Sequence, residues 1–192
     1  RLHDSNLDGL KARGFHLTGT YARNFSVKNA QLDLCEWNKM GLPGANLENG
    51  EAYGCKFDDT NFSAHPRRGL PASNLRRFTV VKRRYSADQA LTTEAVTSFK
   101  RSNLQGVNMI ESQLEEPDMT KAQLKGAKAY QAIWKAPNLT EAGLAGLIGF
   151  KSLRLEPVIK TNAEPNKKPI WLKIAQATVN HDVNPTWNSW FK

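Results

Sequence analysis

A five-residue period runs through the first third of the chain and restricts its fold more than any other feature. The residues two places before each step are mostly small or apolar, from Ser5 to Thr60, so two residues in every five point inward. A helix repeats about every 3.6 residues and a strand about every 2, so neither gives this pattern, and a repeat architecture is predicted. The steps meet only apolar residues: Leu2, Leu7, Ala12, Leu17, Ala22, Val27, Leu32, Trp37, Leu42, Leu47, Ala52, Phe57 and Phe62.

A second tract with the same period runs from Phe99 to Leu144. Segments of both tracts resemble the pentapeptide-repeat family, and the resemblance covers about two thirds of the chain. The segments that carry it include Ala45-Asn46-Leu47-Glu48-Asn49, Ser102-Asn103-Leu104-Gln105-Gly106 and Ala122-Gln123-Leu124-Lys125-Gly126.

The resemblance implies an all-β fold, a right-handed, four-sided parallel β-helix in which each pentad forms one side and four pentads form a coil. Residues twenty apart should then stack on one wall, and roughly six coils spaced about 4.8 Å would make a rod on the order of 29 Å long. Gly and Asn tolerate the backbone angles of corners. They recur two places after the central residue, at Gly9, Gly14, Gly19, Asn24, Asn29, Gly44, Asn49, Gly54, Gly106, Gly126 and Gly146.

Four large or reactive side chains fall at inward positions. Trp37 and Trp134 are predicted to be core residues, because they sit at central positions of the repeat. Cys35 and Cys55 lie one coil apart on one wall, a separation compatible with a disulfide. In-register stacking seldom aligns two sulfur atoms, so we expect two reduced interior thiols. Two cysteines leave the redox compartment undecided.

The period divides the chain into four segments. We expect a first β-helix tract at 1–63, a basic loop insertion at 64–95, a second tract at 96–148, and a C-terminal helical cap with an aromatic tail at 149–192. The gap from Phe62 to Phe99 is not a multiple of five, so the insertion is expected to leave the coil wall. Phe78 to Val81 could form a short strand within it, and Ser86 could cap a short helix.

The candidate partner-binding residues lie in the insertion and in the tail. Insertions of this length usually have a function or lack order. The basic residues with interleaved aromatics could bind a protein partner, could simply be solvated, or could contact nucleic acid. The candidates are Arg67, Arg68, Arg76, Arg77, Phe78, Lys82, Arg83, Arg84, Tyr85, Trp187, Trp190 and Phe191.

The tail contains a predicted helix at Pro169–Val179, with proline suited to its first turn. An open β-helix end needs a cap, and this helix is the natural candidate. Trp187, Trp190 and Phe191 either pack on that cap or contact a partner or a further part of the protein.

No residue pattern indicates a reaction, a cofactor or a metal site. The four histidines are scattered, and none has a cysteine or carboxylate at metal-ligand spacing. No glycine-rich phosphate loop follows a predicted strand. The acidic pairs Asp58-Asp59 and Glu115-Glu116 fall on outward positions, as expected for a solvated face. We therefore expect a chain without catalytic activity of its own.

Charge is distributed unevenly, and this bears on function. The net charge is +9, yet residues 1–63 carry 7 basic and 8 acidic side chains, whereas residues 64–95 carry 7 and 2. No apolar run approaches the roughly 18 residues that cross a bilayer, so no membrane association is expected. The compartment is not indicated, and a soluble chain could be cytoplasmic or secreted.

The favoured function is a non-enzymatic protein-protein interaction or scaffold module. The resemblance also implies that the chain could belong to a host-directed bacterial effector. Because the chain starts at Arg1 with the repeat in register, we expect a domain of a longer protein. Other pentapeptide-repeat proteins shield gyrase through an acidic surface that mimics DNA, and some use loops that project from the coil. Topoisomerase protection is thus an alternative, and nucleic-acid contact through the basic loop is another.

Overall fold

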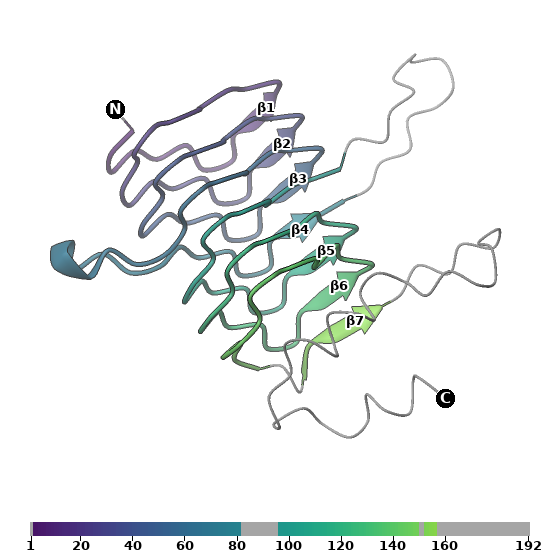
Figure 1. Ribbon diagram of the computed structural model, residues 1–192. Coiled ribbons are helices and arrows are strands. Elements are labelled where there is room, and N and C mark those ends of the chain that lie inside the picture. Colours follow the sequence, from purple (N-terminus) through teal and green to yellow (C-terminus); the bar gives the residue numbers. More distant parts are fainter. Residues whose placement is uncertain (1, 82–95, 150–151, 157–192) are drawn as a thin grey trace, which may run out of the picture.

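The computed structural model describes residues 2–81, 96–149 and 152–156. Its short strands pair in parallel in one sheet, in chain order, and coils of backbone stack along a single axis (Figure 1). The chain forms a parallel β-solenoid, as the repeat predicted. The strands are β1 (Lys11–Arg13), β2 (Gln31–Asp33), β3 (Glu51–Tyr53), β4 (Thr79–Val80), β5 (Gln113–Glu115), β6 (Ile133–Lys135) and β7 (Arg154–Glu156).

The coil has four walls, and twenty residues return the chain to the same wall. Ala12 pairs with Leu32 and Leu32 with Ala52, which confirms the predicted register. We call β1–β7 the strand wall. Single parallel bridges build the Tyr21 wall (Tyr21, Gly41, Asn61, Asn103, Gln123, Gly143), the asparagine wall (Asn6, Ser26, Asn46, Asn74, Asn108, Lys128, Ile148) and the Glu36 wall (His16, Glu36, Lys56, Ser98, Asp118, Asn138).

Corners between walls use a left-handed backbone conformation. The Leu10 N–H donates to the Leu7 carbonyl at 3.1 Å, and Gly9 within this turn has a φ of 74°. All the glycines and asparagines predicted at corners have a positive φ. The same conformation recurs at residues that do not favour it, such as Leu34 (φ 52°) and Ala136 (φ 40°). The fold of the coil therefore imposes the left-handed conformation at its corners. A glycine or asparagine there only lowers the free-energy cost of that conformation.

Aromatic side chains fill much of the coil axis. Trp37 and Trp134 are fully buried, as predicted. The Trp37 ring packs edge-on against Phe57 with centroids 5.8 Å apart, and Phe57 stacks on Phe99 at 5.0 Å with an interplanar angle of 15°. Aromatic contacts of this kind add stability beyond the burial of apolar area.

Buried hydroxyl and thiol groups face carbonyls of the preceding coil. Thr60 Oγ1 donates to the Trp37 carbonyl at 2.6 Å, and Ser73 and Ser102 make equivalent bonds to Leu42 and Phe57. Cys55 Sγ lies 3.1 Å from the Leu32 carbonyl oxygen. Cys35 and Cys55 are both buried free thiols, as expected. These hydroxyl and thiol groups therefore have a partner one coil away, whereas the buried Trp37 Nε1 has none.

The prediction that residues 64–95 leave the wall as one excursion is wrong. Asn74 bridges Asn46, and β4 pairs with both β3 and β5, so residues 73–81 belong to the coil. Leu75 follows Phe62 by thirteen residues instead of five, and Phe99 follows Val80 by nineteen. Two insertions, of eight and fourteen residues, therefore interrupt the coil. Each shifts the count, so stepping by fives from Phe62 misses the wall segment between them.

The second tract was predicted to end at residue 148, but β7 pairs with β6, so the coil continues into the segment 149–192 predicted as cap and tail. The rest of that segment, from residue 157 on, and the predicted helix start at Ser86 lie outside the described residues. None of the helical segments in 2–81, 96–149 and 152–156 has the length and apolar character needed to cross a membrane.

Candidate interaction surface

The structure separates the predicted partner-binding residues into three groups. Arg67 and Arg68 lie in the short 3-10 helix η1 (Pro66–Arg68), within the first insertion, and both are exposed. Arg76, Arg77 and Phe78 lie in the coil wall. The remaining candidates fall outside the described residues: Lys82, Arg83, Arg84, Tyr85, Trp187, Trp190 and Phe191.

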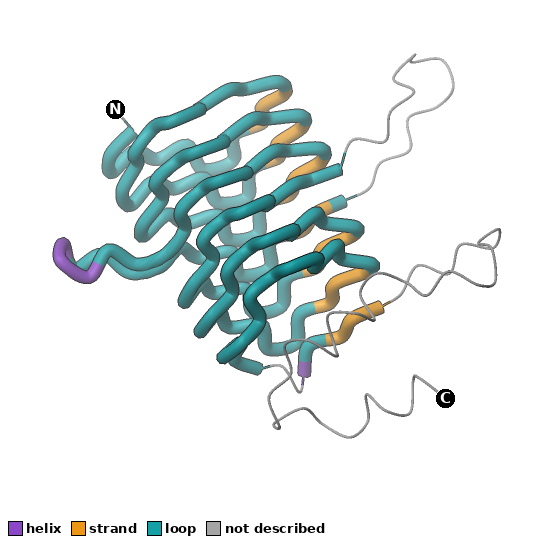
Figure 2. The backbone as a smooth tube through the Cα atoms, in the orientation of Figure 1, coloured by secondary structure: helices purple, strands orange, loops and turns teal. Residues whose placement is uncertain are grey.

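The first insertion forms a closed hairpin. The His65 N–H donates to the Leu70 carbonyl at 2.9 Å, and the Leu70 N–H returns a bond to His65 at 3.3 Å. Inside it, the Arg68 N–H donates to His65 and Gly69 adopts a left-handed φ of 64°. Figure 2 shows the helical turn at the tip of this hairpin, projecting from the stacked coils. The sequence thus presents Arg67 and Arg68 on a short, internally bonded projection.

A tyrosine on the Tyr21 wall holds the hairpin in place. The Arg68 guanidinium lies 5.9 Å from the centroid of the Tyr21 ring, within cation–π range. The ring itself lies over Gly41, where a Cβ atom would be only 2.5 Å from Tyr21 Cδ2. At the base of the hairpin, the Pro71 carbonyl accepts the Gly44 N–H at 2.7 Å. These contacts tie the projection to the coil beneath it.

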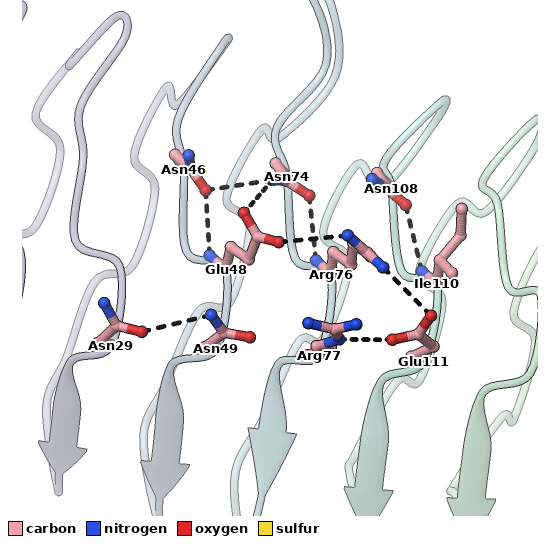
Figure 3. Close-up of polar contacts among 10 residues, drawn as sticks. All are labelled: Asn29, Asn46, Glu48, Asn49, Asn74, Arg76, Arg77, Asn108, Ile110 and Glu111. Atoms are coloured by element: carbon pink, nitrogen blue, oxygen red, sulfur yellow. Dashed lines mark hydrogen bonds and ion pairs between the residues drawn. The ribbon is translucent and has the colours of Figure 1, made fainter.

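Arg76 and Arg77 are engaged in ion pairs on the asparagine wall (Figure 3). Arg76 Nη2 lies 3.2 Å from Glu111 Oε1, and Arg76 Nη1 lies 3.7 Å from Glu48 Oε1. Arg77 Nε donates to the other oxygen of Glu111. Hydrogen bonds from Arg77 and then Arg76 hold the pKa of the Glu111 carboxyl below its usual value. This group of charges is neutral overall.

An asparagine ladder supports that group. Asn46 Oδ1 accepts the Glu48 N–H at 3.1 Å, and Asn74 Oδ1 accepts the Arg76 N–H at 3.1 Å (Figure 3). Asn74 Nδ2 also donates to Asn46 Oδ1 at 3.2 Å. The side chains thus fix the turns that carry the charged residues.

Phe78 is not available to a partner, which corrects its place among the predicted contacts. It is 1% exposed and packs edge-on against Phe57 at 6.4 Å. The physical reason is the place of Phe78 in the repeat. It lies two residues before the central residue Val80, and side chains at that place point inward.

Opposite charges also pair between coils on the Glu36 wall. Lys56 Nζ lies 2.7 Å from Glu36 Oε1, Lys100 Nζ lies 3.2 Å from Asp118 Oδ2, and Arg101 binds Asp59 through two bonds of 2.7 Å. Sequence reasoning missed these ladders. Opposite charges twenty residues apart, as in Glu36 and Lys56, were the available signal.

The remaining features of the described residues are their potential metal ligands and one hollow. In the described part of the chain, no three His, Cys, Asp or Glu side chains converge to hold a metal ion. An open hollow of about 520 Å³ at the first coil is lined by Leu7, Leu10, Lys11, Ala12, Arg13, Gly14 and Phe15. It lies at the first of the described coils.

Comparison with known proteins agrees with the repeat. The family model described as pentapeptide repeats matches residues 97–133 in eight copies. No curated protein matches the chain.

Solved structures that resemble the chain include two pentapeptide repeat proteins and one resistance protein. Rfr23 from the cyanobacterium Cyanothece 51142 is 16% identical, with 79% of this chain and 87% of that one covered and a TM-score of 0.30. HetL, involved in heterocyst differentiation regulation in Nostoc sp. strain PCC 7120, is 13% identical, with 74% and 88% covered and a TM-score of 0.26. A trypsin-treated form of QnrB1, a plasmid-mediated fluoroquinolone resistance protein, is 12% identical, with 90% and 98% covered and a TM-score of 0.27.

Proposed function

We propose that this chain, a pentapeptide-repeat protein, is a non-enzymatic interaction module in which a rigid coil presents the hairpin at residues 65–70 to a protein partner. The module would serve as a scaffold, either alone or as part of a bacterial effector. Arg67 and Arg68 are its principal contacts, and an acidic protein surface is the expected complement.

One observation carries this proposal. The hairpin exposes two arginines, yet it is closed by backbone hydrogen bonds and held by Tyr21. A contact group that is already ordered loses little conformational entropy on binding. On the walls, in contrast, Arg76, Arg77 and Arg101 are neutralised by their own neighbours. The hairpin therefore offers positive charge that these three wall arginines do not offer.

The experiment is site-specific photocrosslinking. A photoreactive amino acid replaces Arg67 in the full chain, and a matched chain carries it at the exposed Thr18 on the Glu36 wall. We expect one protein to be crosslinked from position 67 and not from position 18. Its affinity for the purified chain should fall about tenfold in the Arg67→Ala/Arg68→Ala variant, which removes two charged contacts. A partner that binds this variant as tightly as the wild type would exclude the hairpin as the contact.

Topoisomerase protection is the second candidate function, and the two insertions favour it. Some gyrase-shielding pentapeptide-repeat proteins use projecting loops, and here insertions of eight and fourteen residues interrupt the repeat at two places in the sequence. A gyrase supercoiling assay with a quinolone tests it. Restored supercoiling that depends on the first insertion would support protection, and no rescue at excess protein would eliminate it.

A further inference from the structure

Several wall lysines pair with a carboxylate one coil away, but among the described residues the neighbouring Lys125 and Lys128 do not. Lys28 pairs with Asp8 and Lys121 pairs with Glu141, each partner lying one coil away. Lys128 instead lies between Asn108 and Ile148 on the asparagine wall. Lys125 lies two places after Gln123 of the Tyr21 wall, and Gln105 and Ala145 stand twenty positions before and after it. Both lysines are exposed, and neither has an ion-pair partner within residues 2–81, 96–149 and 152–156.

An apolar area adjoins these lysines at the last coils of the asparagine wall. Tyr130 is 45% exposed and Ile148 is 40% exposed. The Tyr130 ring lies over the backbone of Gly149, where a Cβ atom would be 2.7 Å from the ring, so it borders Ile148. Ile110 lies one coil before Tyr130 and is partly exposed. We call Ile110, Lys125, Lys128, Tyr130 and Ile148 the lysine-isoleucine surface.

We propose that the lysine-isoleucine surface docks an acidic segment of a protein partner that also carries apolar side chains. The inference rests on the proposed interaction role and adds a second contact on a different part of the coil. Ammonium groups that have no ion-pair partner among the described residues favour an acidic complement. An exposed tyrosine between aliphatic side chains is typical of the apolar centre of a protein interface.

The charge and chemistry of the surface argue against two other occupants. Residues 157–192 carry five lysines and only two acidic residues, so their charge does not complement Lys125 and Lys128. A nucleic acid could use the lysines and the tyrosine, but two isoleucines would add nothing to the binding of phosphate or base.

The test measures fluorescence anisotropy with a short labelled peptide of alternating glutamate and leucine, added to the full chain. Alternation places the leucines on one face of an extended peptide. Lys125→Ala/Lys128→Ala should weaken binding about fivefold, as for two surface ion pairs. Tyr130→Ser/Ile148→Ser should weaken it about tenfold, as for the centre of an interface. Lys121→Ala/Lys135→Ala is the matched control, because it removes the same charge from the same coil and should leave affinity unchanged.

The competing outcomes are distinguishable. Equal losses for the two lysine pairs, or no measurable binding to the wild type, would overturn the proposal. So would a single-stranded DNA oligonucleotide that binds more tightly than the peptide and is insensitive to Tyr130→Ser/Ile148→Ser. Arg67→Ala/Arg68→Ala should leave peptide binding intact. If that variant alone abolished it, the lysine-isoleucine surface would be excluded while the hairpin proposal stood.

Discussion

At the scale of single residues, the coil depends on small polar groups in inward positions. Thr60, Ser73 and Ser102 each donate a hydroxyl hydrogen bond to a carbonyl of the preceding coil, and each is almost fully buried. In the sequence these positions look tolerant of substitution, because Ala and Gly occupy the equivalent places in other pentads. The hydrogen bond makes them specific, because it ties two coils together beside the backbone ladder.

Thr60→Val keeps the shape of the side chain and removes its donor. We expect the free energy of unfolding to fall by about 1–2 kcal/mol, because the Trp37 carbonyl loses a buried partner. Urea denaturation measures the loss, with Thr18→Val at an exposed position as the control. An equal effect of the two substitutions would show that the buried hydrogen bond contributes nothing.

At the scale of elements, the hairpin depends on a glycine that lies far from it in sequence. Tyr21 can lie flat only because Gly41 has no side chain, and Arg68 then packs on the Tyr21 ring. The hairpin is thus positioned by two residues of two earlier coils. The sequence of the hairpin predicts a turn and exposed arginines. It does not predict which residues of the coil the hairpin contacts.

Gly41→Ala should displace the Tyr21 ring and loosen the hairpin. Loss of a cation–π contact worth roughly 0.5–1 kcal/mol would raise hairpin opening about two- to fivefold. Limited trypsin digestion reports this as faster cleavage after Arg67 and Arg68. The matched control is Gly143→Ala on the same wall, where the new methyl group meets only the flexible Gln123 side chain. Equal cleavage rates in the two variants would contradict the anchoring role.

The ion pairs between coils should make the stability of the fold depend on pH. The pKa of Glu111 is lowered from its ordinary value of 4.5, first by the Arg77 hydrogen bond and then by that of Arg76. A carboxyl with a lowered folded-state pKa stabilises the fold fully above its ordinary value, and the contribution is lost as pH falls through the lower folded value.

We therefore expect the melting temperature to fall as pH drops below 4.5, with a smaller fall in Glu111→Gln. Thermal unfolding at pH 7 and at low pH measures this difference. Glu141→Gln, at a carboxylate that is 65% exposed, should keep the wild-type profile. An unchanged pH profile in Glu111→Gln would mean that the Arg76 and Arg77 contacts do not stabilise the fold.

At the scale of the whole molecule, the coil behaves as a continuous rod into which insertions are spliced. Phe62 lies on the Tyr21 wall, and the first insertion returns the chain to the asparagine wall at Leu75, where an unbroken repeat would have placed it. Stability in such a rod comes from contacts between neighbouring coils. The hairpin should therefore be separable from the fold.

Deleting residues 65–72 restores the spacing of five between Phe62 and Leu75. We expect the shortened chain to keep the wild-type circular dichroism spectrum and a melting temperature within a few degrees, while losing the crosslinked partner. Deleting residues 74–78 is the contrasting variant, because it removes Leu75 and Phe78 and with them one wall. That chain should lose cooperative unfolding. A hairpin deletion that unfolded the chain would show that residues 65–72 belong to the folding unit.

The sequence by itself determined the period, and with it the parallel coil, the walls, the buried tryptophans and the glycine and asparagine corners. The period is a local pattern that can be counted along the chain, and the resemblance of its segments to the pentapeptide-repeat family implies the four-sided parallel coil. It also predicted that Arg67 and Arg68 lie outside the repeat, on an insertion.

Only the tertiary structure decided where the chain rejoins the coil and which charges meet. Phe78 became core, and Arg76 and Arg77 became paired, because backbone hydrogen bonds to the coils on either side set the register of residues 73–81. Such bonds join residues up to 35 positions apart, as from the Gln113 N–H to the Phe78 carbonyl. Their register depends on insertion length, which a count of fives does not contain.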